Sequence, residues 1–172
     1  MSHLKVLISK IRGGAACPPR ATLRHIVLSS VGGFIGIAAV AYLASASHSP
    51  LLLGSFGATC LLMFGFPDNP FSQPRNVIAG HFLSSLVGLA FLALLGTHWW
   101  SLALAAGTAI SLMQLTRTVH PPAGSNPLII MLSMPKWDFL LFPTLTGAVI
   151  LVVVAVLFNN LMKGRAYPRY WI

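Results

Sequence analysis

The chain has 172 residues, of which 56% are hydrophobic and only 8% are charged, and its formal net charge is +9. A soluble domain carries roughly a quarter charged residues because water must solvate its surface, so this composition excludes an ordinary soluble domain. The length leaves room for about four to six membrane crossings and little else.

The positive charge is concentrated at the two ends of the chain. Basic residues precede the first long apolar run and follow the last one, at Lys5, Lys10, Arg12, Arg20, Arg24, Lys163, Arg165 and Arg169. Basic segments that flank membrane spans are typical of cytoplasmic ends, where anionic lipid attracts them. No basic face interleaved with aromatic residues is present. We therefore expect membrane lipid, and not nucleic acid, as the partner of these charges.

Apolar runs separated by proline, glycine and polar residues indicate about six helices. The long runs approach the roughly 20 residues needed to cross a bilayer core. The second and fifth runs are short, and at about 1.5 Å per residue a helix over the fifth would reach only about 20 Å. We predict that both short runs are half-helices or broken helices. In chain order the runs are 24–44, 50–66, 76–96, 99–115, 122–134 and 139–158.

The order long–short–long occurs twice, and the two short runs resemble each other. Residues 56–59 and 61–64 can be laid against 122–125 and 129–132 with a small gap. An odd number of crossings in each copy makes the second copy inverted relative to the first. Six crossings also return the C-terminus to the side of the N-terminus, which agrees with two basic ends. We predict an all-α membrane protein of about six transmembrane helices in two inverted three-helix repeats.

This scheme divides the chain into a basic cytoplasmic segment (1–23), a transmembrane domain (24–158) and a basic cytoplasmic tail (159–172). An alternative is a cleaved signal peptide, because Ala44-Ser45-Ala46 resembles a signal-peptidase site after an apolar stretch. The polar leader before that stretch is long, and the stretch is close to spanning length. We therefore expect a retained first helix.

The densest polar and helix-breaking stretch between apolar runs covers residues 116–127. Pro121 and Pro122 lack N–H groups and are well placed in the first turn of a helix, so a helix can begin here. A helix N-terminus presents unpaired N–H groups to an anion. The alternative is a tight turn whose polar groups face water or lipid phosphates. The predicted substrate-binding residues of this stretch are Thr118, His120, Pro121, Pro122, Gly124, Ser125 and Asn126.

The other short run begins with Gly54-Ser55-Phe56-Gly57-Ala58. We predict Ser55 and Gly57 as a second half-site, with close helix packing as the alternative. His81 lies about one turn into the third run, where a histidine usually faces the bundle interior. It either titrates during transport or bonds a neighbouring carbonyl.

Two arginines, Arg75 and Arg117, are predicted at the cytoplasmic ends of helices, where they would attract anions. Arg75 has a second interpretation as the partner of Asp68 in the preceding loop. Lys136 and Asp138 are expected on the outer side.

Several kinds of site are missing from the sequence. Both acids of the chain, Asp68 and Asp138, lie outside the predicted spans, so no intramembrane carboxylate is available to bind a cation or relay protons. Cys17 and Cys60 have no metal-type spacing and are expected to be free thiols. No nucleotide-binding or hydrolase motif is present. We expect no enzyme activity, no metal and no cofactor, and a transported anion or neutral solute fits better than a cation.

Three ordered motifs resemble the HPP family of small integral membrane proteins. His120-Pro121-Pro122-Ala123-Gly124 is similar to the family signature, Gln73-Pro74-Arg75-Asn76-Val77-Ile78 to its second motif, and the glycine-rich start at Ser55 and Gly57 to its third. The similarity runs over about residues 24–158. Residues 68–72 depart slightly from the commoner sequence before the second motif.

The resemblance implies a transporter or channel in a bacterial inner membrane. Family members in cyanobacteria and plant plastids are implicated in nitrite transport, so nitrite is the leading substrate. Small channels of this size often assemble symmetrically, and we expect a homo-oligomer. The alternatives are a structural or assembly subunit, and a channel for another small anion or a neutral solute. A membrane enzyme with His120 as its base is disfavoured by the lack of an acid partner for that histidine.

Overall fold

The structure is a computed structural model that describes residues 3–12, 14–48 and 52–172, with side chains described from Lys5 onward. Every regular element in these ranges is helical. In chain order they are α1 (His3–Arg12), α2 (Leu23–Ser47), α3 (Phe56–Cys60), the π-helix η1 (Leu61–Gly65), the 3₁₀-helix η2 (Pro70–Ser72), α4 (Pro74–Leu95), α5 (Trp99–Leu115), the 3₁₀-helix η3 (Pro121–Ser125), α6 (Asn126–Ser133), the 3₁₀-helix η4 (Trp137–Leu140), the π-helix η5 (Leu141–Leu145) and α7 (Thr146–Leu161).

These elements confirm the all-α membrane fold. Within the described ranges, three helical stretches are long and apolar enough to cross a membrane: Leu23–Ser47, Pro74–Leu95 and Trp137–Leu161. Two shorter apolar helices cover Phe56–Gly65 and Trp99–Leu115. The predicted start of the second run, residue 50, lies outside the described residues.

Both short runs are broken, each in a different way. The first begins as α3 and continues for five residues as the π-helix η1. The second begins as the 3₁₀-helix η3, in which Pro121 and Pro122 occupy the first turn, where N–H groups have no intrahelical partner, and becomes the eight-residue α6. The glycine and proline punctuation of the sequence therefore marked real interruptions.

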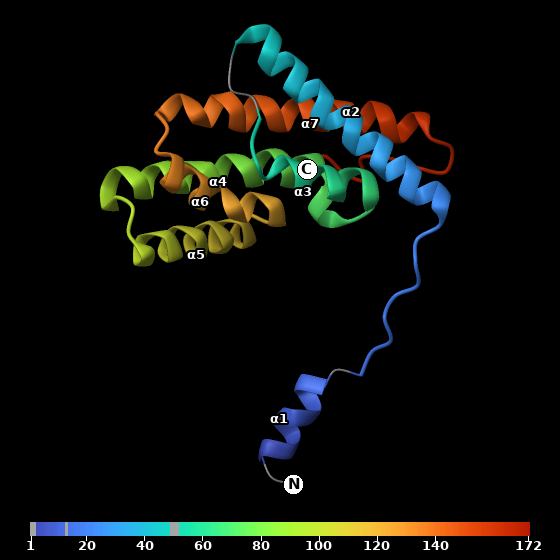
Figure 1. Cartoon of the computed structure of the whole chain (residues 1–172), viewed down its shortest axis with the longest axis horizontal. Helices are drawn as coiled ribbons and strands as arrows, with labels where there is room; N and C mark the ends of the chain where they lie inside the picture. Colours follow the sequence, from blue (N-terminus) through green and yellow to red (C-terminus); the bar gives the residue numbers. More distant parts are fainter. Residues whose placement is uncertain (1–2, 13, 49–51) are drawn as a thin grey trace.

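The helices pack in two groups, α2 with α7 and α4 with α5 and α6, and a contact between α4 and α7 joins the groups. In Figure 1, α2 crosses over α7, while α4, α6 and α5 lie on the other side of α7. Gly32 and Gly36 let α2 approach closely, because a Cβ at Gly32 would lie 2.5 Å from the ring of Phe64. In the predicted repeat, α2 corresponds to α5 and α4 to α7. The contact between α2 and α7 then corresponds to the contact between α5 and α4, and both contacts are present. The inverted repeat itself stays a prediction.

Four helix termini meet at one end of the bundle. The Arg75 Nη2 at the start of α4 donates to the Thr116 carbonyl at the end of α5 (3.1 Å), and the Arg24 Nη2 at the start of α2 donates to the Lys163 carbonyl after α7 (3.2 Å). We call this the basic end. α1 lies apart from the bundle, joined to it by an extended segment (Figure 1).

The C-terminal residues pack onto the basic end. The buried Tyr167 donates through its hydroxyl to the Ser72 carbonyl (2.7 Å), and the Arg169 backbone N–H donates to Gln73 Oε1 (2.7 Å). Arg169 also forms the ion pair with Asp68 (2.6 Å). Asp68 therefore pairs with Arg169 and not with Arg75.

Candidate functional site

The starts of the two short helices meet in the middle of the bundle. Ser55, which precedes α3, donates its hydroxyl to Oδ1 of Asn126, the first residue of α6, at 2.8 Å. Both side chains are buried, with 5% and 0% of their surface exposed. The two broken runs are thus joined through side chains that come from opposite halves of the sequence.

Beside this contact, two histidines share one threonine hydroxyl. Thr59 Oγ1 lies 2.9 Å from Nε2 of His81 and 2.9 Å from Nε2 of His120. The ring centroids of the histidines are 4.9 Å apart. All three side chains are completely buried. The same hydroxyl lies 3.1 Å from the Ser55 carbonyl, which is a second acceptor for its one proton. A hydroxyl donates one hydrogen bond and can accept others, so Thr59 bridges two rings of opposite donor character when its proton points to a histidine.

The surrounding acceptors fix the donor character of each ring. His120 Nδ1 lies 2.7 Å from the Phe71 carbonyl, which can only accept, so Nδ1 carries the proton and Nε2 accepts from Thr59. His81 must then donate through Nε2 to Thr59. Its Nδ1 accepts from the Asn126 amide nitrogen at 3.0 Å. With the Thr59 proton on the His120 side, the whole chain is satisfied with both rings neutral.

The chain of hydrogen bonds runs in one direction. From Ser55 it passes to Asn126, His81, Thr59 and His120, and it ends at a backbone carbonyl. A side branch leads from the Asn126 amide to Ser85 Oγ (2.9 Å) and on to Thr144 Oγ1 (3.1 Å). We refer to these residues as the histidine network: Ser55, Thr59, His81, Ser85, His120, Asn126 and Thr144.

Small residues on α4 bring the network together. A Cβ at Gly80 would lie 2.8 Å from the Cβ of His120, and a Cβ at Gly88 would lie 2.8 Å from the Cα of Pro127. Between them Ser84 donates to the Ala123 carbonyl at 2.5 Å. The spacing of four residues places all three on one face of α4. This face lets η3 and α6 approach the helix that carries His81.

The network is polar but carries no fixed charge. Among the described residues, no three His, Cys, Asp or Glu side chains lie close enough together to hold a metal ion. Two histidines joined through a hydroxyl can instead move a proton from one ring to the other. Because two positive charges at this separation would repel strongly, the pair holds at most one extra proton at a time.

The structure brings together four of the residues predicted for the site and separates the others. His81, His120, Asn126 and Ser55 belong to the network. Ser125 bonds the Pro122 carbonyl within its own turn (2.9 Å), and Thr118 Oγ1 lies 2.7 Å from Thr116 Oγ1 at the basic end. The remaining predicted positions have no side-chain hydrogen bond to the network: Pro121, Pro122, Gly57 and Gly124.

The two predicted anion-attracting arginines lie at the basic end. Arg75 contacts the Thr116 carbonyl, as described above. Arg117 is exposed and has a positive φ of 57° where the chain leaves α5. Neither side chain enters the histidine network, and their attraction of an anion stays a prediction.

Sequence reasoning missed Thr59, Ser85 and Thr144. Two of them had a readable signal, since Thr59 follows Ser55 by four residues and Ser85 follows His81 by four. On a helix that spacing puts the side chains on one face. A polar pair on one face of an apolar helix predicts an inward-facing stripe. Thr144 has no comparable partner along the chain and is identified only by the folded structure.

Comparison with known proteins agrees with this architecture. The chain is similar to two transmembrane proteins of Dictyostelium discoideum, 37% identical over 166 residues and 36% identical over 174 residues. These alignments cover 90% and 94% of this chain but only 58% and 56% of the relatives, so the chain spans less than two thirds of their length. No solved structure matches. A profile of the HPP transmembrane region matches residues 18–168, and the chain therefore belongs to this family of integral membrane proteins.

Proposed function

We propose that the protein transports a small inorganic anion across the membrane, with nitrite as the leading substrate, and that the histidine network is its proton-exchanging centre. One observation supports this above all: two histidines from different halves of the chain are linked through Thr59 in the middle of the bundle. Ionisable side chains are rare inside membrane proteins and usually mark transport or proton pathways.

A shared threonine allows a proton to pass between the rings without the threonine hydroxyl itself becoming charged. When His81 takes an extra proton on Nδ1, the hydrogen bond from the Asn126 amide to that atom breaks. Nε2 of His81 then gives its proton to Thr59 Oγ1 while Thr59 gives its own proton to Nε2 of His120. One positive charge then moves from one ring to the other, and the hydroxyl ends with one proton as it began. A cationic ring attracts an anion, and transfer of its proton to a weak-acid anion produces a neutral molecule. A neutral molecule crosses an apolar barrier far more easily than an ion does.

The charge inventory favours an anion over a cation. The chain has two acidic residues, Asp68 and Asp138. Asp68 is paired with Arg169 at the basic end, and Asp138 lies in η4. Neither side chain is part of the histidine network. A carboxylate-based cation site in the middle of the bundle is therefore disfavoured.

Charge distribution also gives the proposed orientation. Arg24, Arg75, Arg117, Lys163 and Arg165 gather around the basic end, whereas Lys136 and Asp138 follow α6 at the other. The positive-inside rule places the basic end in the cytoplasm. In a bacterial cell the protein would lie in the inner membrane, with Arg75 and Arg117 near the cytoplasmic mouth. We further propose a symmetric homo-oligomer without enzymatic activity.

A structural role is the second candidate, and one observation favours it. Six of the seven network side chains are completely buried and Ser55 is 5% exposed, so a solute reaches them only when the short helices separate. A fully satisfied buried network also stabilises a bundle without any transport.

Flux into proteoliposomes separates the two candidates. We expect saturable uptake of nitrite, with nitrate, formate and chloride as comparison anions, and an uptake rate that depends on pH. His81→Gln and His120→Gln should each lower nitrite uptake at least about tenfold and flatten its pH dependence, since removal of an acid–base group typically costs 10²–10⁴-fold. His98→Gln is the matched control, because His98 stacks on Trp100 outside the network.

Each result has a defined meaning when size-exclusion profiles show folded protein. No uptake of any tested anion by the wild-type protein would contradict anion transport and favour the structural role. Uptake that keeps its rate and pH profile in both network variants would contradict the proton-exchanging centre.

A further inference from the structure

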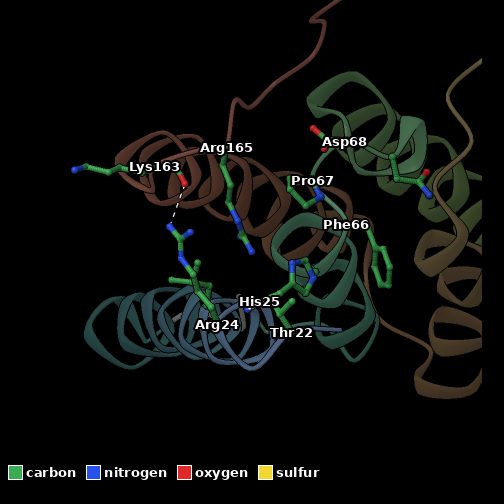
Figure 2. A pocket seen from close by; sticks show the side chains of 12 residues that line it. Thr22, Arg24, His25, Phe66, Pro67, Asp68, Lys163 and Arg165 are labelled. Carbon is green, nitrogen blue, oxygen red and sulfur yellow. Dashed lines mark hydrogen bonds between the residues drawn. The ribbon is translucent and has the colours of Figure 1, made fainter. Parts of the chain in front are cut away.

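A second site lies at the basic end, outside the histidine network. A cavity of about 690 Å³ opens between the start of α2, the loop after η1 and the residues after α7. This volume is within the roughly 300–1,000 Å³ that small-molecule sites occupy. Figure 2 shows Arg24 and His25 on one side of the cavity and Arg165 on the other, with Asp68 farther along the rim.

The cavity carries more positive than negative charge. Arg24 and Arg165 line it, together with the imidazole of His25. Lys163 borders it through its carbonyl, which accepts from Arg24, while its ammonium group points away from the cavity in Figure 2. Asp68 is the acid on its wall, and Arg169 already pairs with that carboxylate at 2.6 Å. In the described part of the chain, neither Arg24 nor Lys163 has a carboxylate partner. These two cations therefore lack a counter-charge within hydrogen-bonding distance, and Asp68 is shared between Arg169 and the more distant Arg165.

The guanidinium of Arg165 is fixed by hydrogen bonds through one of its terminal nitrogens, while the other has no partner. Its Nη1 donates to the Phe64 carbonyl at the end of η1 (2.9 Å) and to Asn159 Oδ1 (2.9 Å). Its Nη2 is covered and has no hydrogen-bond partner within the described residues. Leaving a covered charged donor unpaired is unfavourable, and an anion that displaces the groups covering Nη2 would remove this deficit.

The basic groups also act on one another. Burial and the nearby charge of Arg24 lower the pKa of Arg165, while Asp68 opposes that shift. The repulsion between two guanidinium groups across a cavity is the electrostatic signature of a site that an anion stabilises. The positive end of the 25-residue helix α2 faces the same wall, where Thr22 caps its first turn.

We propose that this cavity binds a phosphate group, carried by an anionic lipid headgroup or by a soluble phosphate. Phosphate offers several oxygens to donors on different walls and accepts paired N–H groups of arginine. The cavity lies where membrane helices end, which is the depth of lipid phosphates, and basic pockets between such helices are known lipid-headgroup sites. This site is independent of the proposed anion transport.

Native mass spectrometry of the protein in a neutral detergent tests the site. The two probes are dioctanoyl phosphatidylglycerol and inorganic phosphate, with dioctanoyl phosphatidylcholine as the neutral lipid. We expect saturable retention of the anionic lipid or of phosphate, and weaker retention of the neutral lipid. Arg24→Gln combined with Lys163→Gln should lower the affinity about tenfold, as expected for losing one charge-assisted hydrogen bond.

Two further variants make the result specific. Lys10→Gln with Arg12→Gln removes the same amount of charge from α1 and should leave retention unchanged. Lys163→Gln alone removes no hydrogen bond made by that side chain in the structure, so it tests the cavity even if the double variant fails to fold. We expect it to lower the affinity about threefold.

The two ligand sources give different patterns. If inorganic phosphate is retained and displaces the lipid, the site recognises the phosphate group itself. If the lipid alone is retained, the source is the membrane. Retention that is equal in the wild-type protein and the cavity variants would overturn the site, and so would an equal loss in the α1 control.

Discussion

The histidine network and the basic cavity use similar polar side chains under opposite conditions. In the network each donor meets an acceptor, both rings are satisfied as neutral groups, and the side chains are buried. In the cavity, cations face one another and Arg165 keeps an unpaired Nη2. The hydrogen bonds of the first region are therefore complete without a ligand, and the second region resembles a site that is completed by a ligand.

This difference predicts different responses to mutation. Removing one member of a satisfied buried network leaves other groups unpaired, and each such group costs about 1–3 kcal/mol. Removing one cation from a crowded basic cavity relieves repulsion, so stability changes little while ligand affinity falls. Stability measurements should therefore detect the network, and binding measurements should detect the cavity.

The largest effect is expected for Thr59→Val. Valine keeps the shape of threonine but removes the hydroxyl, leaving the Nε2 atoms of His81 and His120 without partners. We expect the free energy of unfolding to fall by about 2–4 kcal/mol. Titration with sodium dodecyl sulfate from neutral micelles, followed by far-UV circular dichroism, measures this change.

Thr59→Ser is the matched control, because serine keeps the bridging hydroxyl and loses only one methyl group. It should cost about 1 kcal/mol through lost packing. If both variants lose the same stability, the hydroxyl bridge contributes nothing and the contrast with the cavity disappears.

The apolar pattern of the sequence predicted most of the fold. The fourth run was predicted over 99–115, and α5 covers Trp99–Leu115. The third was predicted from 76 and begins at Pro74, because proline is well accommodated in the first turn of a helix. Composition and periodicity are local properties, so they locate helices well.

The site was only partly predictable, for the opposite reason. His81 and His120 each stood out as polar residues in an apolar context, but Thr59 lies 22 and 61 residues away from them. Nothing local reports which hydroxyl bridges two distant rings. Similarly, Tyr167 lies in a basic segment, and its burial against Ser72 depends on contacts 95 residues away.

A smaller effect is expected where α4 approaches the network. Gly80→Ala would place a Cβ 2.8 Å from the Cβ of His120 and 3.0 Å from the Thr118 carbonyl oxygen. The neighbouring backbone must shift, which typically costs about 1–3 kcal/mol. Gly107→Ala is the control, since no atom lies within 4 Å of its Cβ, and alanine should stabilise that helix by up to about 1 kcal/mol. The same titration compares them, and equal stability of the two variants would mean that close approach at Gly80 is not needed.

The smallest effect concerns Tyr167, which fixes the segment that follows Arg165 at the basic end. Its hydroxyl donates to the Ser72 carbonyl, so Tyr167→Phe should cost about 1 kcal/mol near neutral pH. Burial raises the pKa of Tyr167 above its ordinary value of 10.0. The folded protein thus keeps the phenol hydroxyl protonated while the unfolded chain ionises. This contribution to stability, complete below pH 10, is lost as the pH rises further.

Unfolding titrations from about pH 8 to about pH 11 should therefore show a steeper alkaline loss of stability for the wild-type protein than for Tyr167→Phe. Tyr170→Phe is the control, because that hydroxyl is 3.3 Å and 3.4 Å from its partners and the side chain is partly exposed. A Tyr167→Phe variant with the same alkaline slope as the wild type would show that the docked segment at the cavity is not held by this hydroxyl.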